Sequence, residues 1–109
     1  MTKEEFVFEE LKSNLDEIVS SMEPDIIERK RKGWKMVFFK KEVLTECHSF
    51  NLSTHGGYIK EGDPRILIGL DFNQYGKRWP SFTSTLYWYS YNKETNELKK
   101  LYGLQEVIF

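Results

Sequence analysis

Cys47 and His48 are adjacent in the chain, and His55 follows seven residues after His48. A thiolate beside an imidazole is the arrangement of a cysteine nucleophile, and Cys/His pairs also bind metal ions. Neighbours in a strand point to opposite faces, however, and one cysteine with two histidines falls short of the four ligands of a structural zinc site. We therefore expect Cys47 to be a buried apolar thiol and both histidines to lie at the surface, with no catalytic or metal-binding role.

Three acidic residues, Glu61, Asp63 and Asp71, form a second candidate constellation. Paired carboxylates perform acid–base or glycosidic chemistry. Glu61 and Asp63 instead lie in a Gly/Pro-rich turn, where aspartate is favoured for its local hydrogen bonds. The glycines, including Gly56 and Gly57, form neither a phosphate loop nor a dinucleotide fingerprint. The sequence therefore predicts a non-catalytic protein without a cofactor.

Charge is distributed unevenly, although the 109 residues sum to a net charge of −1. Residues 1–28 carry nine acids and two bases, residues 29–41 seven bases and no acid, and residues 42–109 eight acids and seven bases. Phosphate backbones attract such a basic run, and Trp34 or Phe39 nearby could stack on bases. The candidate basic patch consists of Arg29, Lys30, Arg31, Lys32 and Lys35. A pI near 6.1 is low for a nucleic-acid binder, so this reading ranks second.

The most strand-like segment, residues 81–91, alternates tyrosine with Leu86 and Trp88. One of the two sets must face the core. If that set is Leu86 and Trp88, the tyrosines form a ribbon on the other face, and such residues are enriched at protein interfaces. Two nearby aromatic residues extend the ribbon, so the predicted partner-binding surface consists of Tyr75, Trp79, Tyr87, Tyr89 and Tyr91.

An N-terminal helix is expected over about residues 3–22. Thr2 and Glu5 form a capping box, and Pro24 limits the end of the helix. Its apolar positions recur at helical spacing: Val7, Leu11, Leu15, Ile18 and Met22. Its exposed face carries acids that could steer the protein toward a basic partner, such as the nucleic-acid site of a nuclease: Glu5, Glu9, Asp16, Glu17 and Glu23.

The remaining sequence, residues 26–109, is typical of strands and turns. Strands are expected at about 34–44, 47–52, 65–72, 81–91 and 97–102, and a strand is favoured over a helix for residues 25–32. Loops are expected at 54–57, 61–64 and 73–80, a hairpin turn at 92–96, and an edge strand at 104–109, of which residues 107–109 could pair across a dimer. The predicted fold is α+β, a single domain over residues 1–109 in which the amphipathic helix packs on a curved antiparallel sheet of about five or six strands.

Composition limits the class of protein. With 39% hydrophobic, 16% aromatic and 30% charged residues, the chain is too apolar for disorder and too polar for a membrane protein. A single cysteine and an acidic N-terminus without a signal pattern indicate a cytoplasmic protein.

We expect a small non-catalytic protein-binding module of bacterial or phage type that occludes its partner, as immunity proteins, antitoxins and phage inhibitors do. One alternative is a nucleic-acid-binding domain that uses residues 29–41 and sheet aromatics. A second is a ligand pocket or enzyme site in the helix-covered sheet, lined by Trp34, His48, Tyr58, Asp71, Trp79 and Tyr87.

Overall fold

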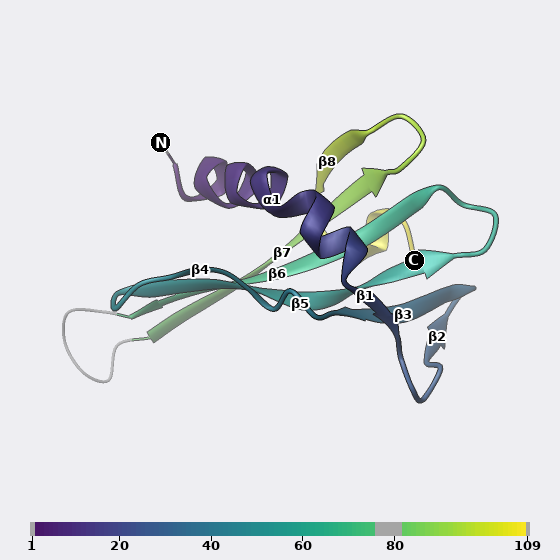
Figure 1. The fold of residues 1–109 in the computed structure, drawn as a ribbon, viewed down its shortest axis with the longest axis horizontal. Helices are drawn as coiled ribbons and strands as arrows, with labels where there is room; N and C mark the ends of the chain where they lie inside the picture. Colours follow the sequence, from purple (N-terminus) through teal and green to yellow (C-terminus); the bar gives the residue numbers. More distant parts are fainter. Residues whose placement is uncertain (1, 76–81, 109) are drawn as a thin grey trace.

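The computed structural model describes residues 2–75 and 82–108. Its elements follow in the order α1 (Lys3–Ser20), β1 (Met22–Pro24), β2 (Lys30–Arg31), β3 (Trp34–Phe39), β4 (Val43–Glu46), β5 (Phe50–Lys60), β6 (Arg65–Tyr75), β7 (Phe82–Asn92), β8 (Glu97–Leu101) and the short 3₁₀ helix η1 (Leu104–Glu106). The strands form one curved antiparallel sheet, and α1 lies across one of its faces (Figure 1). The α+β prediction is confirmed, with eight strands rather than five or six.

Helix α1 begins at the predicted capping box. The Thr2 hydroxyl accepts a hydrogen bond from the Glu5 backbone N–H at 3.1 Å, and the Glu5 carboxylate accepts one from the Thr2 N–H at 3.4 Å. The helix ends at Ser20, two residues before the expected end, because Met22 already pairs with Phe39 as the start of β1. Among residues 2–75 and 82–108, no helix combines the length and apolarity needed to cross a bilayer.

The sheet has more strands than expected because two of the expected strands before β5 are interrupted. The expected strand over residues 34–44 is interrupted at residues 40–42, so β3 and β4 pair separately with the same side of β5. Likewise only Lys30 and Arg31 of residues 25–32 are extended, and they pair with β3 beside β1. The sheet order is β1-β3-β5-β6-β7-β8, with β2 beside β3 and β4 beside β5.

Two predictions for the chain around β5, one of a loop and one of a strand, were wrong. Residues 54–57, expected as a loop, lie inside β5, with an irregular register between Thr54 and Gly56. Gly57 allows β5 and β6 to lie close together, because a Cβ at this position would collide with the Leu67 carbonyl oxygen. Residues 47–49, expected as part of a strand, form the turn between β4 and β5, so Cys47 is exposed rather than buried.

The face of the sheet against α1, called the inner face here, holds the larger core. Fully buried residues of α1 (Val7, Leu11 and Ile18) pack there on buried side chains of the sheet: Val37, Phe39, Leu52, Ile66, Ile68, Leu70, Phe72, Tyr87, Tyr89 and Tyr91. The prediction that the tyrosines of β7 form a surface ribbon is therefore wrong. Tyr87, Tyr89 and Tyr91 are 8%, 0% and 9% exposed, because the apolar stripe of α1 lies over them.

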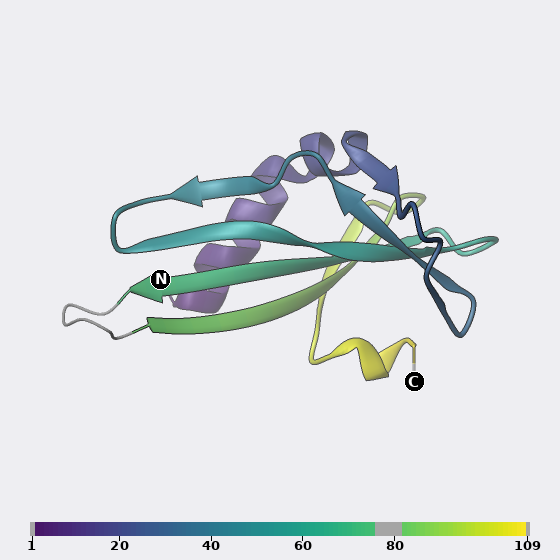
Figure 2. The same ribbon diagram turned by 90° about the horizontal axis from the view of Figure 1, so that it is seen from below.

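The opposite, outer face carries a smaller second core. The chain after β8 returns under the sheet, and Leu101 and Ile108 pack with Trp34 and Leu67. Residues 104–108 therefore cover the outer face as a 3₁₀ turn and do not form the expected edge strand. This cover reaches only part of the outer face (Figure 2), and no segment among residues 2–75 and 82–108 packs over the part formed by β4 and the adjoining ends of β5, β6 and β7.

Candidate functional site

The uncovered part, called the open outer face, is built from alternate positions of four neighbouring strands. Register pairs Val43 with Ser53, Ser53 with Asp71, and Asp71 with Leu86, so these side chains lie in one row across the sheet. The next row joins Glu46, Asn51, Asn73 and Ser84. Seen from below, these strands lie in front of α1, and the C-terminal segment lies to one side (Figure 2). The open outer face is thus a continuous surface on the side away from the helix.

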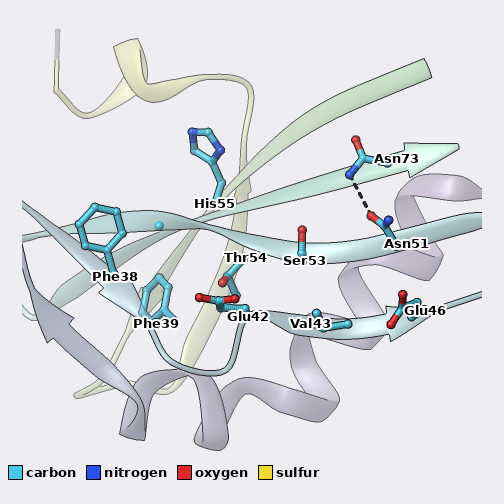
Figure 3. A pocket seen from close by; sticks show the side chains of 11 residues that line it. Phe38, Phe39, Glu42, Val43, Glu46, Asn51, Ser53, Thr54, His55 and Asn73 are labelled. Atoms are coloured by element: carbon cyan, nitrogen blue, oxygen red, sulfur yellow. Dashed lines mark hydrogen bonds between the residues drawn. The ribbon is translucent and has the colours of Figure 1, made fainter. Parts of the chain in front are cut away.

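Polar side chains of the open outer face are fixed by one another. Asn73 donates from Nδ2 to Asn51 Oδ1 at 2.8 Å, and Asn51 donates from Nδ2 to Tyr75 Oη at 2.8 Å (Figure 3 shows the first bond). His55 Nδ1 lies 2.9 Å from Asp71 Oδ2, and the Trp88 ring meets the imidazole edge-on at a centroid distance of 6.1 Å. These side chains are held in place by contacts within the chain.

Large apolar side chains are also exposed on this face. Seven large apolar side chains are exposed in the described part of the chain, and four of them lie on this face or at its edge: Phe38, Val43, Tyr75 and Leu86, at 38%, 47%, 45% and 44% exposure. Apolar side chains that stay exposed beside ordered polar groups are typical of a surface that binds another protein.

A hollow of about 480 Å³ lies where β3 ends and β4 begins. It exists because both strands pair with β5, which leaves a gap opposite residues 54–56. Phe38 and Val43 provide its apolar wall, and His55, Asn51 and Asn73 line its polar side (Figure 3). The hollow is open to solvent and suits a protruding side chain of a partner better than an enclosed small molecule.

His55 and Asp71 form a histidine–carboxylate pair, but the predicted thiol does not join it. Cys47 and His48 lie in the turn before β5. His55 is six residue steps beyond the end of that turn, which is roughly 20 Å along the strand at the usual rise per residue. Within the described residues, no three His, Cys, Asp or Glu side chains gather as metal ligands.

The remaining acids of the second constellation do not approach Asp71. Asp63 lies in the β5–β6 turn, where its carboxylate binds Arg65 Nη2 at 2.7 Å. This guanidinium holds the pKa of Asp63 below its usual range. Its role is to fix the turn, and no carboxylate pair forms with Asp71 on β6.

The predicted ligand pocket is not assembled. Tyr87 points to the inner face, whereas Trp34, Tyr58 and Asp71 belong to the outer face. His48 lies in the β4–β5 turn, and Trp79 lies outside the described residues. Of the four predicted partner-binding aromatics that the structure describes, Tyr75 is exposed and Tyr87, Tyr89 and Tyr91 are buried.

The residues of the predicted acidic face are exposed, and two of them are paired with lysines that lie outside the predicted basic patch. Glu5, Glu9, Asp16 and Glu17 lie on α1, whereas Glu23 lies on β1. Salt bridges join Glu17 to Lys41 at 3.3 Å and Glu23 to Lys40 at 3.2 Å.

The basic patch lies on the other side of the fold, where the turn at 25–29 projects away from α1 (Figure 1). The patch residues are exposed: Arg29, Lys30, Arg31, Lys32 and Lys35. Arg29 is neutralised by Asp25, which its Nε approaches at 2.7 Å.

Sequence reasoning did not single out Asn51, Ser53 or Asn73 as site residues. Their signal is a short alternation of period two: polar residues at 51 and 53 flank the buried Leu52, and polar residues at 71 and 73 flank the buried Phe72. The pattern is visible in the sequence, but its meaning depends on which face the helix covers. Comparison with protein-family models, with curated proteins and with solved structures finds no match to this chain, so the candidate site rests on its geometry.

Proposed function

We propose that the chain is a small non-catalytic protein-binding module that docks its partner on the open outer face. The observation that carries the proposal is that Phe38, Val43, Tyr75 and Leu86, all more than a third exposed, surround a group of hydrogen-bonded polar side chains. Binding would occlude the partner's own working surface, which is how immunity proteins, antitoxins and phage inhibitors act.

The chemistry of the surface fits this role. Leu86 and Val43 offer apolar area, and the hollow beside Phe38 accepts an anchor side chain from the partner. Around them, the amide and imidazole groups of Asn51, Asn73 and His55 provide hydrogen bonds at the rim. Apolar anchors inside a polar rim are the usual anatomy of such an interface.

A nucleic-acid-binding domain is the second candidate, supported by the exposed bases of the β2–β3 hairpin. Lys40 and Lys41 already pair with Glu23 and Glu17, and Arg29 pairs with Asp25, so these bases are committed to ion pairs. If the chain binds nucleic acid, the affinity should fall steeply with salt concentration. Binding should also be lost when the charges of Arg29, Arg31 and Lys35 are reversed.

The test compares surface variants of the tagged full chain. The partner is first captured from the native host, purified and titrated against the wild type by calorimetry. Leu86→Asp and Val43→Asp should each weaken this binding about 30-fold or more, as expected for an interface anchor worth about 2 kcal/mol. The matched control is Ile26→Asp, which places the same charge on an apolar side chain that is 97% exposed in the turn after β1 and lines neither the hollow nor the rows of the open outer face.

Two results would contradict the proposal. The first is a partner that binds Leu86→Asp and Val43→Asp as tightly as the wild type. The second is the capture of no stoichiometric protein together with retardation of RNA or DNA at low salt, which would favour the nucleic-acid reading.

A further inference from the structure

A second hollow, of about 540 Å³, lies on the inner-face side between the first turns of α1 and strands β7 and β8. The rings of Phe8 and Tyr89 contribute its aromatic surface, with centroids 6.2 Å apart and planes tilted by 47°. Glu4, Glu5, Glu9 and Lys100 line the rest. The sheet separates this hollow from the open outer face, so the two surfaces can be tested independently.

The hydroxyl of Tyr89 has no hydrogen-bond partner. The side chain is 0% exposed, and among the described residues Tyr89 Oη is the one buried side-chain polar atom left unpaired. Its neighbours in the inner core are apolar or aromatic, yet Tyr89 also lines the hollow. A buried polar atom without a partner is unfavourable, so native proteins rarely keep one without a reason.

The surroundings of this hydroxyl are acidic. Burial, the neighbouring Tyr87 and the charge of Glu4 raise the pKa of Tyr89, so the phenol keeps its proton at neutral pH. Lys100 is the one base that lines the hollow, and it pairs with Glu4 at 2.9 Å. Glu9 makes no ion pair with any residue that the structure describes. The lining therefore keeps an excess of two negative charges.

The structure already holds a cation over aromatic rings at this edge. Lys100 Nζ lies 5.7 Å from the ring centroid of Tyr87 and 5.6 Å from that of Tyr102. Ammonium and guanidinium groups are attracted to aromatic faces in this distance range.

We propose that the hollow is a binding site for an organic cation with an ammonium or guanidinium head. An N–H of the cation donates to Tyr89 Oη, Glu5 and Glu9 balance its charge, and the Phe8 ring contacts its apolar stem. Such a cation is either a free small molecule or a Lys or Arg side chain of a bound polypeptide.

Nuclear magnetic resonance titration of the full chain tests the site. N-acetyl-arginine amide should shift the amide resonances of residues 5, 8, 9, 89 and 100. N-acetyl-norleucine amide (neutral) and N-acetyl-glutamate (anionic) should not. A short Arg-containing peptide that binds at least tenfold more tightly than the amide would assign the site to a polypeptide side chain, and equal affinity would assign it to a free small molecule.

Tyr89→Phe is the decisive variant, because it removes only the unpaired hydroxyl. It should weaken binding of N-acetyl-arginine amide roughly tenfold, the usual effect of losing a hydrogen bond to a charged group. The same variant should raise the melting temperature of the free protein, since an unpaired buried polar atom disappears. Glu9→Gln should weaken binding by a smaller factor, and Asp16→Asn, on an exposed part of α1 outside the hollow, should leave it unchanged.

Three outcomes would overturn the proposal: equal shifts with the neutral or anionic probe, unchanged cation binding by Tyr89→Phe, or no shift with any probe. A lower melting temperature for Tyr89→Phe would also contradict it, because it would mean that a buried water already satisfies the hydroxyl.

Discussion

Strands β6 and β7, of eleven residues each, contribute to both faces of the sheet. Their inner face is buried, whereas part of their outer face is exposed. On the inner face, Leu70 and its register partner Tyr87 are buried under α1. One position along, Asp71 and Leu86 are register partners on the outer face, and Leu86 is 44% exposed. An aromatic strand alone does not reveal which of its faces is surface. The buried face is the one on which another element packs.

The two covers also differ in size. Helix α1 spans 18 residues and closes the inner face along much of β5 to β7, whereas the C-terminal turn reaches only the part of the outer face near Trp34 and Leu67. The consequence is one large core, one small core and one uncovered surface. Mutations at matched positions should separate these three regions by the size of their effect on stability.

The largest effect is expected at the inner core. Leu70→Ala removes a fully buried side chain and should lower the free energy of unfolding by about 2–5 kcal/mol. Leu86→Ala is the matched control on the neighbouring strand, where an exposed leucine should change stability by less than about 0.5 kcal/mol. Urea unfolding followed by circular dichroism measures both. Similar losses for the two leucines would show that the outer face is also core.

An intermediate effect is expected at the small core. Ile108→Ala removes a buried side chain that packs with Trp34, and Trp88 lies against the same cluster. We expect a loss of about 2 kcal/mol, the lower end for such a truncation, because a short segment can adjust. Tryptophan emission of the variant should shift to longer wavelength as water reaches the indoles. Wild-type emission and stability would mean that residues 104–108 do not cover this face.

Two glycines, one within β5 and one in the turn after it, should differ less in the stability lost on substitution. Gly57→Ala would force a Cβ against the Leu67 carbonyl oxygen and should cost about 1–3 kcal/mol. Gly62→Ala, in the β5–β6 turn, meets no atom within 4 Å, and its cost of about 1 kcal/mol comes from a φ of +81°. The melting temperatures of the two variants show which substitution is more destabilising. A tolerated Gly57→Ala would indicate that residues 54–57 form the loop that their composition suggests.

The smallest effect concerns the turn beside the open outer face. Hydrogen bonds from the Arg29 side chain lower the pKa of Asp25, and the Arg29 guanidinium lies 5.9 Å from the Phe38 ring. Because the folded pKa lies below the unfolded one, this stabilisation is present above about pH 4 and is lost as pH falls through the folded value.

Melting temperatures from pH 6 to pH 2.5 test this sign. Asp25→Asn should melt below the wild type at pH 6, and the difference should narrow as the pH falls below 4. A difference that stays constant across this range would show that the Asp25 charge contributes nothing.

The sequence patterns were sufficient for the helix and for the fold class. The capping box at Thr2 and the apolar spacing of α1 depend only on local residues, and the structure has both. The pairing of short strands was not predictable in this way, since β1 and β2 exist only because β3 offers them an edge. His55 and Asp71 were both noted as candidates, but their contact depends on the β5–β6 register, which the sequence does not specify.

The assignment of the tyrosines failed for a related reason. Tyr87 and Trp88 have similar interface and core propensities, so composition could not rank the two faces of β7. The decisive information is the position of α1, which follows from the whole fold.

Cross-saturation from the purified partner to the methyl groups of this chain tests the central claim most directly. The account predicts that the methyl resonances of Leu86 and Val43 lose intensity on the open outer face, whereas those of the inner-core residues Leu70 and Leu52 do not. Saturation confined to the exposed Ile26 and Ile27 of the turn beyond β1, or to methyl groups of α1, would contradict it.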